Sequence, residues 1–298
     1  MYFSFWPNPA QDFETVAGLC SHAESTGWDG IWYADHFMPN AEDTSADWPE
    51  CWTTLTALAC RVPRLRIGTL VIGNTYRHPA VLAKMAATLD HICGGRLVLG
   101  LGAGWQENEH RQYGIPFHDV PGRLERLGEA CELITRLFRE EKTNFAGRHY
   151  TLEDASFEPK PVQDPLPLLV GGGGEKVTLR IAAQWAQEWN VWGTPETLAH
   201  KISVLEGHCR DLGRDPTTIR KSAQALLFMS DDAAWLEAMR NRPMQMATMI
   251  GTPAELRDVV AAYADAGVDE LIIPDFTLGE GEAKRAAMDR FLLEVAGR

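Results

Sequence analysis

Short apolar runs alternate with stretches of helical period from one end of the chain to the other. An apolar run of about four to eight residues, bounded by polar and turn-forming residues, predicts a buried strand. Eight such runs occur, and they are Tyr2–Trp6, Gly30–His36, Arg64–Gly73, Gly95–Gly102, Pro167–Gly171, Glu188–Trp192, Ser222–Phe228 and Glu270–Asp275. The segments between them favour helices, and one of these has a single apolar stripe from Val81 to Leu89.

The number of strands distinguishes between two common α/β architectures. A doubly wound sheet normally stops at about six strands, whereas eight alternating strand and helix units match a TIM barrel. The sequence therefore predicts an α/β fold in which residues 1–298 form a single (β/α)8 barrel domain. A proline-rich stretch, Asn144–Pro167, predicts a long insertion after the fourth strand unit, with one hairpin in it.

Capping residues mark two helix starts. Thr194 and Thr252 each precede a proline, and a hydroxyl residue before a proline at the first helical position is typical of a helix start. Glu255 follows Thr252 at the spacing of a capping box. Helices are therefore predicted to begin at Pro195 and Pro253.

The charge and the cysteine content exclude several classes of protein. The formal net charge of -13 repels nucleic acid, so no nucleic-acid partner is expected. No apolar run approaches the roughly 18 residues of a membrane span, and the amino terminus lacks the pattern of a signal peptide. The six cysteines are spread without a C-x-x-C pair, which predicts free thiols in a reducing compartment. A cytoplasmic protein without a membrane partner is expected.

Polar and glycine residues follow the ends of five predicted strands. In a (β/α)8 barrel the active site forms where the carboxyl ends of the strands meet, so these residues are the candidates for the site. They are Asp35 and His36, Gly73–His78, Gly102–Trp105, Gly171–Gly174 and Asn190. We expect them to surround one pocket that takes a small-molecule substrate.

Four consecutive glycines, Gly171–Gly174, precede a helix that is predicted to begin near Glu175. Each glycine loses backbone entropy on folding and packs no side chain, so a run of four indicates close approach of a ligand to the backbone. Free N–H groups at a helix start would bind a phosphate or another anion. A flexible turn is the structural alternative.

His36 is the candidate group for proton transfer, and a buried histidine with a structural hydrogen bond is the alternative. Arg77 is expected to be solvated or paired with a carboxylate. Glu107 and Glu109 stand at a helix start, where the helix dipole accounts for acidic residues without a catalytic role. The histidines lack metal-ligand spacing, so no metal site is proposed, and no motif suggests a catalytic nucleophile.

Four stretches together resemble the bacterial luciferase-like flavin-dependent superfamily. They are GWDGIWYADHFMP (27–39), GTLVIGNTYRHPAVLAKMAATLDHICGGRLVLGLGAGWQENEH (68–110), YGIPFHDVPGRLERLGEA (113–130) and PLLVGGGGEKVTLRIAAQWAQEWN (167–190). The resemblance covers roughly residues 1–230 in register, and the combination is specific although each motif alone is weak. The branch that the chain resembles most is the oxidoreductases that use the deazaflavin coenzyme F420.

The resemblance implies a barrel that binds F420 or a flavin across the strand ends. Leu70 and Val71 match the position of a non-proline cis peptide bond behind the cofactor ring. The positions that line the ring and its side chain correspond to Asp35, Gly73, Asn74, Ala103 and Gly104. The phosphate-binding turn corresponds to Gly172, Gly173 and Gly174. His36 matches a histidine beside the reacting carbon, and a homodimer is expected from the family.

Two positions depart from the branch that oxidises a sugar phosphate. Asn40 stands where that branch has a tryptophan, and Trp105 stands where it has an acidic residue. We therefore assign both residues to the substrate pocket. A tryptophan that faces the cofactor suits a less polar substrate than a sugar phosphate, because pockets for such ligands are mostly apolar.

The resemblance leaves three functional hypotheses open. The first is an oxidoreductase that transfers a hydride between F420 and an unidentified small organic substrate, with His36, held by a neighbour such as Asp35, giving or taking a proton. The second is an FMN-dependent monooxygenase of the luciferase-like type that uses reduced flavin and oxygen. The third is a barrel that binds a flavin without catalysis.

Overall fold

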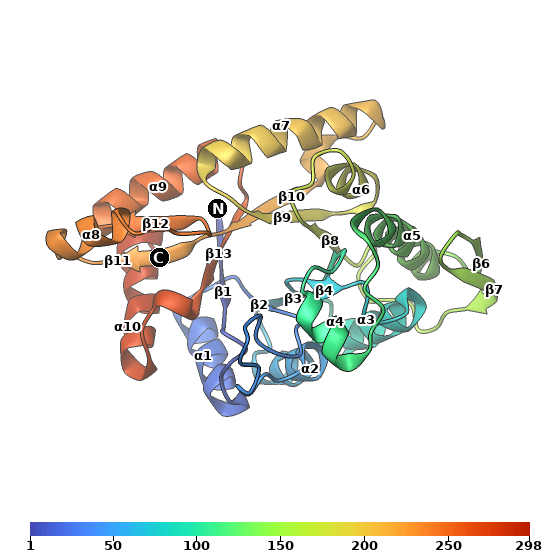
Figure 1. Ribbon diagram of the computed structural model, residues 1–298, viewed down its shortest axis with the longest axis horizontal. Coiled ribbons are helices and arrows are strands. Elements are labelled where there is room, and N and C mark those ends of the chain that lie inside the picture. Colours follow the sequence, from blue (N-terminus) through green and yellow to red (C-terminus); the bar gives the residue numbers. More distant parts are fainter.

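Eight parallel strands close into a ring in the computed structural model, which describes residues 1–298 (Figure 1). In chain order they are β1 (Tyr2–Trp6), β2 (Gly30–Tyr33), β3 (Arg66–Thr69) with its continuation β4 (Ile72–Gly73), β5 (Leu97–Gly102), β8 (Leu168–Gly171), β9 (Glu188–Trp192), β10 (Arg220–Gln224) and β13 (Glu270–Pro274). Strand β1 pairs with the last strand, β13, and β3 pairs with β5, so the ring has no open edge. The predicted TIM barrel is confirmed.

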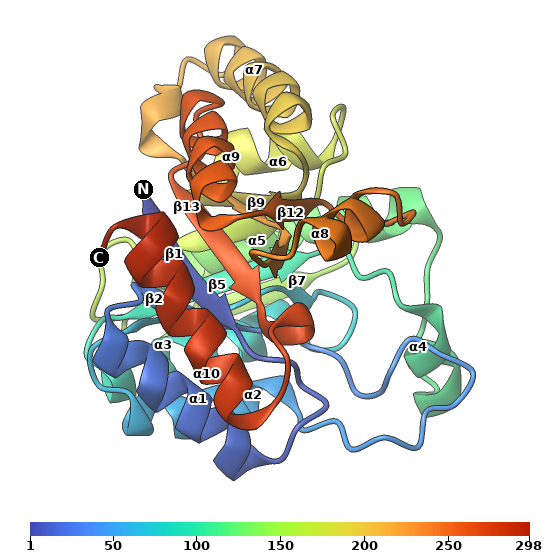
Figure 2. The ribbon, with the colours of Figure 1, turned by 90° about the vertical axis from the view of Figure 1, so that its left-hand side faces the viewer.

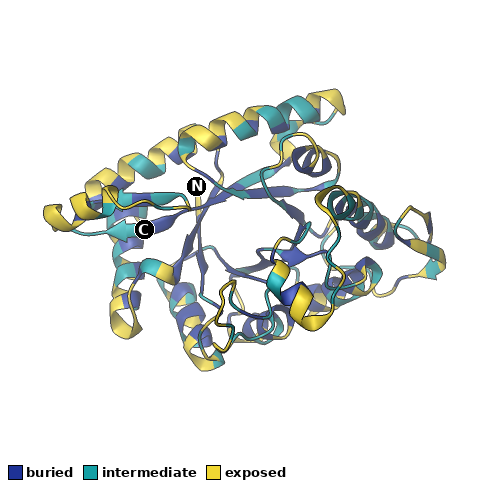
Figure 3. Cartoon of the chain, in the orientation of Figure 1, coloured by how far each residue is buried: buried dark blue, intermediate teal, exposed yellow.

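Helices cover the outside of the barrel, with their inner faces buried and their outer faces exposed (Figure 3). They are α1 (Phe13–Thr26), α2 (Cys51–Arg61), α3 (Pro79–Cys93), α5 (Val120–Arg139), α6 (Thr178–Trp185), α7 (Pro195–Asp211), α9 (Pro253–Asp265) and α10 (Gly281–Arg290), which continues into a π-helical turn (Phe291–Ala296). The two predicted proline starts are confirmed at α7 and α9, where Thr252 and Glu255 form both bonds of the capping box. In α3 the predicted stripe is buried at Leu82 and Leu89, whereas Val81 faces solvent.

Two predicted strands are interrupted at the rim of the barrel. Arg64–Gly73 divides into β3 and β4, and the peptide bond between Leu70 and Val71 is cis, as the resemblance implied. The prediction of one strand over Ser222–Phe228 is wrong, because β10 ends at Gln224. The chain then forms β11 (Leu226–Met229), which pairs with β12 (Thr248–Gly251) in a separate parallel sheet. An apolar run does not reveal that its two halves pair with different partners.

The segments that surround the carboxyl ends of the strands come from several loops. Helix α8 (Ala233–Arg240), between β11 and β12, and helix α4 (Glu107–Tyr113) lie on one side of the barrel, opposite the two termini (Figure 2). The predicted insertion carries the antiparallel hairpin of β6 (Lys142–Ala146) and β7 (Thr151–Ser156), which confirms the expected hairpin. The loops on the side of α4 and α8 therefore form the rim at which a site was predicted.

The state of the cysteines agrees with the prediction. All six cysteines are free thiols, as predicted, and five of them are buried. No helix of the chain combines the length and the apolar character needed to cross a bilayer.

A polar cluster closes the barrel at the amino ends of the strands. Arg66 lies 2.9 Å from Glu270 through its Nη1 and pairs with Glu188 through its Nη2. The hydroxyl of Ser4 and the indole N–H of Trp32 both donate to Oε1 of Glu270, at 2.6 and 2.9 Å. Arg66 of β3 therefore balances two buried carboxylates, one on β9 and one on β13. The predicted site lies at the other end of the barrel.

Candidate functional site

A cavity of about 540 Å³ opens at the carboxyl ends of the barrel strands. Residues from seven of the eight strand ends contribute to its lining. The predicted site residues among them are Asp35, His36, Leu70, Val71, Gly73, Ala103, Gly104, Trp105 and Gly172. The structure thus brings most of the predicted set to one place, while the part that each residue plays in binding stays a prediction.

Four of the predicted site residues do not line this cavity. Asn40 is exposed in the loop after β2, so the structure gives it no place in the pocket. Asn74 is buried, its Nδ2 donates to the hydroxyl of Tyr150 at 3.3 Å, and its Oδ1 has no partner. Gly173 and Gly174 continue the glycine turn beyond the lining.

His36 is held by a carboxylate that was predicted to serve only the helix dipole. Its Nδ1 lies 2.9 Å from Oε1 of Glu109, and Oε2 of Glu109 accepts the backbone N–H of Phe37 at 2.8 Å. The hydroxyl of Tyr76 donates to the same carboxylate. The side chain of Glu109 has no exposed surface, so its interpretation as a residue needed only for the dipole is wrong. No local signal reveals this, because Glu109 becomes buried only when α4 packs against the loop after β2.

The charge on Glu109 fixes which nitrogen of His36 is available. Burial raises the pKa of Glu109, but the hydrogen bonds from His36, Phe37 and Tyr76 outweigh burial and hold that pKa below its ordinary value. The ionised carboxylate accepts a hydrogen bond from Nδ1–H of His36. Nε2 of His36 makes no hydrogen bond within the chain and is free to take or give a proton.

Replacement of Glu109 by glutamine is expected to lower the free energy of unfolding by about 1–3 kcal/mol at neutral pH, since the buried hydrogen bonds lose their charged acceptor. Because the folded-state pKa of Glu109 is lowered, this stabilisation is present above the ordinary pKa of glutamate. It is lost as the pH falls through the lowered value. Urea unfolding across this range measures the effect, and Glu107→Gln, an exposed neighbour on α4, is the control. A loss that does not change with pH would contradict the prediction.

Asp35 is bound by Arg77 rather than by His36. Its Oδ2 accepts from Nη1 of Arg77 at 2.7 Å and from the backbone N–H of Gly73 at 3.2 Å, and its Oδ1 accepts from Nη2 at 3.0 Å. Arg77 also donates to Glu50, the residue that caps α2. Burial raises the pKa of Asp35, although the guanidinium of Arg77 opposes this shift. The expectation that Asp35 holds His36 is therefore wrong. The expectation that Arg77 pairs with a carboxylate is confirmed, and Asp35 is that carboxylate.

Several glycines of the rim make room for other parts of the chain. A Cβ at Gly102 or Gly171 would lie 2.7 or 2.9 Å from a methyl carbon of Val71. A Cβ at Gly100 would lie 1.9 Å from the carbonyl oxygen of Thr69. The interior is close-packed and has no space for such a group. The packing of the chain on itself thus accounts for these three glycines without a ligand, contrary to the expectation for Gly171.

The glycine turn Gly171–Gly174 is followed by three residues of turn, so α6 begins later than predicted. The N–H of Gly172 donates to the neighbouring strand β9. The N–H groups of Gly173 and Gly174 have no acceptor in the chain. Two free N–H groups are compatible with an anion at this turn, although they do not belong to the first turn of a helix of the kind that was predicted.

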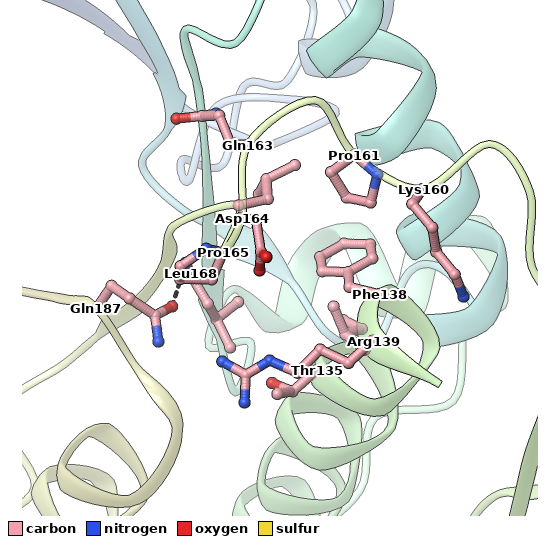
Figure 4. A pocket seen from close by; sticks show the side chains of 12 residues that line it. Thr135, Phe138, Arg139, Lys160, Pro161, Gln163, Asp164, Pro165, Leu168 and Gln187 are labelled. Atoms are coloured by element: carbon pink, nitrogen blue, oxygen red, sulfur yellow. Dashed lines mark hydrogen bonds between the residues drawn. The ribbon is translucent and has the colours of Figure 1, made fainter. Parts of the chain in front are cut away.

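A second cavity, of about 440 Å³, lies between the end of α5 and the proline-rich segment before β8 (Figure 4). Phe138, Arg139, Lys160 and Gln187 are among its lining residues. Nζ of Lys160 donates to two carbonyl oxygens at the end of α5, so its charge serves that helix end. None of the predicted site residues lines this cavity. No cluster of three or more His, Cys, Asp or Glu side chains in the chain is placed to hold a metal ion.

A comparison with protein families matches residues 2–248 to a family described as luciferase-like monooxygenase. Among curated proteins, an F420-dependent glucose-6-phosphate dehydrogenase of Amycolatopsis mediterranei is 38% identical over 157 residues, which are 52% of this chain and 46% of that protein. An F420-dependent hydroxymycolic acid dehydrogenase of Mycobacterium tuberculosis is 29% identical over 213 residues, 71% of this chain and 58% of that protein. The chain thus spans about half the length of the curated relatives that it matches.

Solved structures extend the similarity over the whole chain. An F420-dependent secondary alcohol dehydrogenase, solved with an F420-acetone adduct, has a TM-score of 0.86 and 21% identity, and the match covers 99% of this chain and 98% of that one. The EDTA monooxygenase of Chelativorans sp. BNC1 has a TM-score of 0.82 and 14% identity, covering 100% and 92%. At these identities the match shows a shared fold.

Proposed function

We propose that this chain, which belongs to the luciferase-like monooxygenase family, is an oxidoreductase that transfers a hydride between coenzyme F420 and a small organic substrate. The observation that carries the proposal is His36, an imidazole at the edge of the barrel cavity whose Nδ1 is fixed by the buried carboxylate of Glu109. The curated relatives named as F420-dependent support the choice of cofactor.

The residues of the cavity fit a planar cofactor. The wall formed by β4, β5 and β8 offers backbone and small side chains, with Val71, Ala103 and Gly104 among them. The free N–H groups of the glycine turn suit an anionic group of the cofactor. These residues would hold F420.

When bound, the deazaflavin supplies the hydride acceptor or donor. The chain supplies the proton transfer and the orientation of the reacting groups. Glu109 keeps the proton of His36 on Nδ1, so the neutral imidazole presents an unprotonated Nε2 that can accept a proton from the substrate. In the reverse direction the imidazolium can return that proton. Trp105 packs edge-on against the imidazole of His36, with the ring centroids 5.3 Å apart.

An FMN-dependent monooxygenase is the second candidate, because the family is described as luciferase-like monooxygenase and the EDTA monooxygenase shares the fold. Both cofactors have a tricyclic ring and a phosphate, so the lining of the cavity does not distinguish them. Oxygen consumption with reduced FMN tests this candidate. The single domain, the homodimer and the cytoplasmic location stay predictions.

The purified protein is expected to bind F420 saturably and at least about tenfold more tightly than FMN, measured by titration of the cofactor absorbance. Ala103→Phe would place a large ring in the space beside β4, β5 and β8, and it is expected to weaken F420 binding about tenfold. Ala261→Phe, on the exposed face of α9, is the matched control and should leave binding unchanged. Wild-type protein without saturable F420 binding would remove the proposal.

A further inference from the structure

The cavity has a second wall that differs in chemistry from the glycine-rich one. Strands β4, β5 and β8 lie side by side in the ring and supply the glycine-rich wall. On the remaining part of the ring, β1, β9 and β10 supply Trp6, Trp192 and Gln224, and Met246 comes from the segment before β12. These four residues are called the tryptophan wall below.

The tryptophan wall is broad and apolar. The ring centroids of Trp6 and Trp192 lie 5.9 Å apart, and the ring centroid of Phe276 lies 5.3 Å from that of Trp6. Trp105, with 60% of its surface exposed, stands at the mouth of the cavity next to His36. Aromatic side chains contribute large contact areas and pack well against flat or ring-shaped groups. The wall therefore suits a substrate with a ring-shaped apolar body.

No lysine or arginine lines the cavity. A phosphate or carboxylate at the tryptophan wall, away from the free N–H groups of the glycine turn, would lose its hydration without gaining a cation, which disfavours binding strongly. The one carboxylate in the lining, Asp35, is already paired with Arg77. Lys201, beside the glycine turn, is engaged with the carbonyl oxygen of Gly173 at 2.8 Å and with Glu175 at 3.0 Å. The tryptophan wall is therefore selective for an uncharged substrate.

Two polar atoms of the tryptophan wall are buried without a partner. They are Nε1 of Trp6, which is a donor, and Oε1 of Gln224, which is an acceptor. Buried polar groups nearly always have a hydrogen-bond partner, and both residues line the cavity, so a ligand in the cavity is the candidate partner. A hydroxyl group can serve either atom, because it both accepts and donates hydrogen bonds.

We propose that the tryptophan wall binds an uncharged substrate with a ring-shaped apolar body and a hydroxyl group, and that it rejects phosphorylated and carboxylated analogues. This assignment rests on the function proposed above, because the tryptophan wall shares its cavity with His36 and with the glycine-rich wall that is proposed to hold the cofactor. It excludes a sugar phosphate, the kind of substrate named for several curated relatives.

Three compounds of similar shape test the proposal: cyclohexylmethanol, cyclohexanecarboxylate and cyclohexylmethyl phosphate. Isothermal titration of the protein, alone and saturated with F420, is expected to give an affinity for the alcohol at least about tenfold higher than for either anion. The proposal would be overturned if either anion bound as tightly as the alcohol or more tightly. It would also be overturned if the alcohol bound neither to the protein alone nor to the protein saturated with F420.

Two substitutions sharpen the test. Trp6→Phe keeps an aromatic ring but removes the N–H, and it is expected to weaken binding of the alcohol about tenfold. Trp192→Lys adds a cation to the wall and is expected to reverse the preference toward the phosphate. Trp235→Phe, on α8 outside the lining, is the control and should change neither affinity.

The two proposals can fail separately. Loss of F420 binding, measured by the cofactor absorbance, contradicts the proposed function. The ratio of alcohol to phosphate affinity on the protein alone tests the tryptophan wall by itself. If Trp192→Lys did not improve the affinity for cyclohexylmethyl phosphate, the phosphate would bind away from the tryptophan wall. That result would contradict the assignment of this wall to the substrate.

Discussion

Replacement of His36 by asparagine is expected to lower kcat about 100- to 10,000-fold, the usual contribution of a positioned acid or base, while the affinity for F420 stays unchanged. Asparagine can still donate a hydrogen bond to Glu109, so the support of the loop after β2 is retained. It cannot exchange a proton near neutral pH, so only the proton transfer is removed. Steady-state kinetics with an alcohol that the wild type oxidises, together with F420 titration, measure the two effects.

The matched control for this substitution is His200→Asn. The side chain of His200 is 62% exposed and pairs with Glu175 outside the cavity, so its loss should leave kcat unchanged. An unchanged kcat for His36→Asn would assign His36 a structural role and favour the hypothesis of a barrel that binds its cofactor without catalysis. A loss of F420 affinity in place of kcat would move His36 from the proton transfer to the cofactor site.

Arg66→Met is expected to lower the free energy of unfolding by about 3–5 kcal/mol, because it leaves two buried carboxylates without their main cation. The side chain of Glu270 has no exposed surface, and Glu188 is 6% exposed. Arg220 is the remaining cation, at 4.0 Å from Glu270. Chemical denaturation at neutral pH measures the loss.

The loss from Arg66→Met is expected to shrink as the pH falls. Burial already raises the pKa of Glu188 in the intact protein, and removal of Arg66 raises it further. A carboxyl whose folded-state pKa is raised destabilises the fold when ionised, and this cost disappears as the pH falls through the raised value. Arg64→Met, which removes a 70% exposed partner of Glu24, is the control and should cost less than about 1 kcal/mol. Equal losses for the two variants would contradict the role assigned to Arg66.

The barrel could be predicted because its signals are local. A strand that is buried on both faces has a continuous apolar run, and a helix that covers it has one apolar face. The order of strands and helices can therefore be predicted from the sequence. The end of the barrel strand at Gln224 could not be predicted, because β11 pairs with β12 across an intervening helix. Pairing between segments about twenty residues apart leaves no mark in an apolar run.

The order of the apolar runs was enough to predict the barrel and the rim where the cavity opens. The position of His36 at a predicted strand end, together with the family resemblance, made it the candidate for proton transfer. The hydrogen-bond partner of that histidine could not be predicted, because Glu109 lies 73 residues away in the chain and becomes buried only when α4 packs against the loop after β2. It also decided that Gly102 and Gly171 accommodate Val71. Strand ends are set by local patterns, whereas hydrogen-bond partners and close contacts depend on which distant segments the closed barrel brings together.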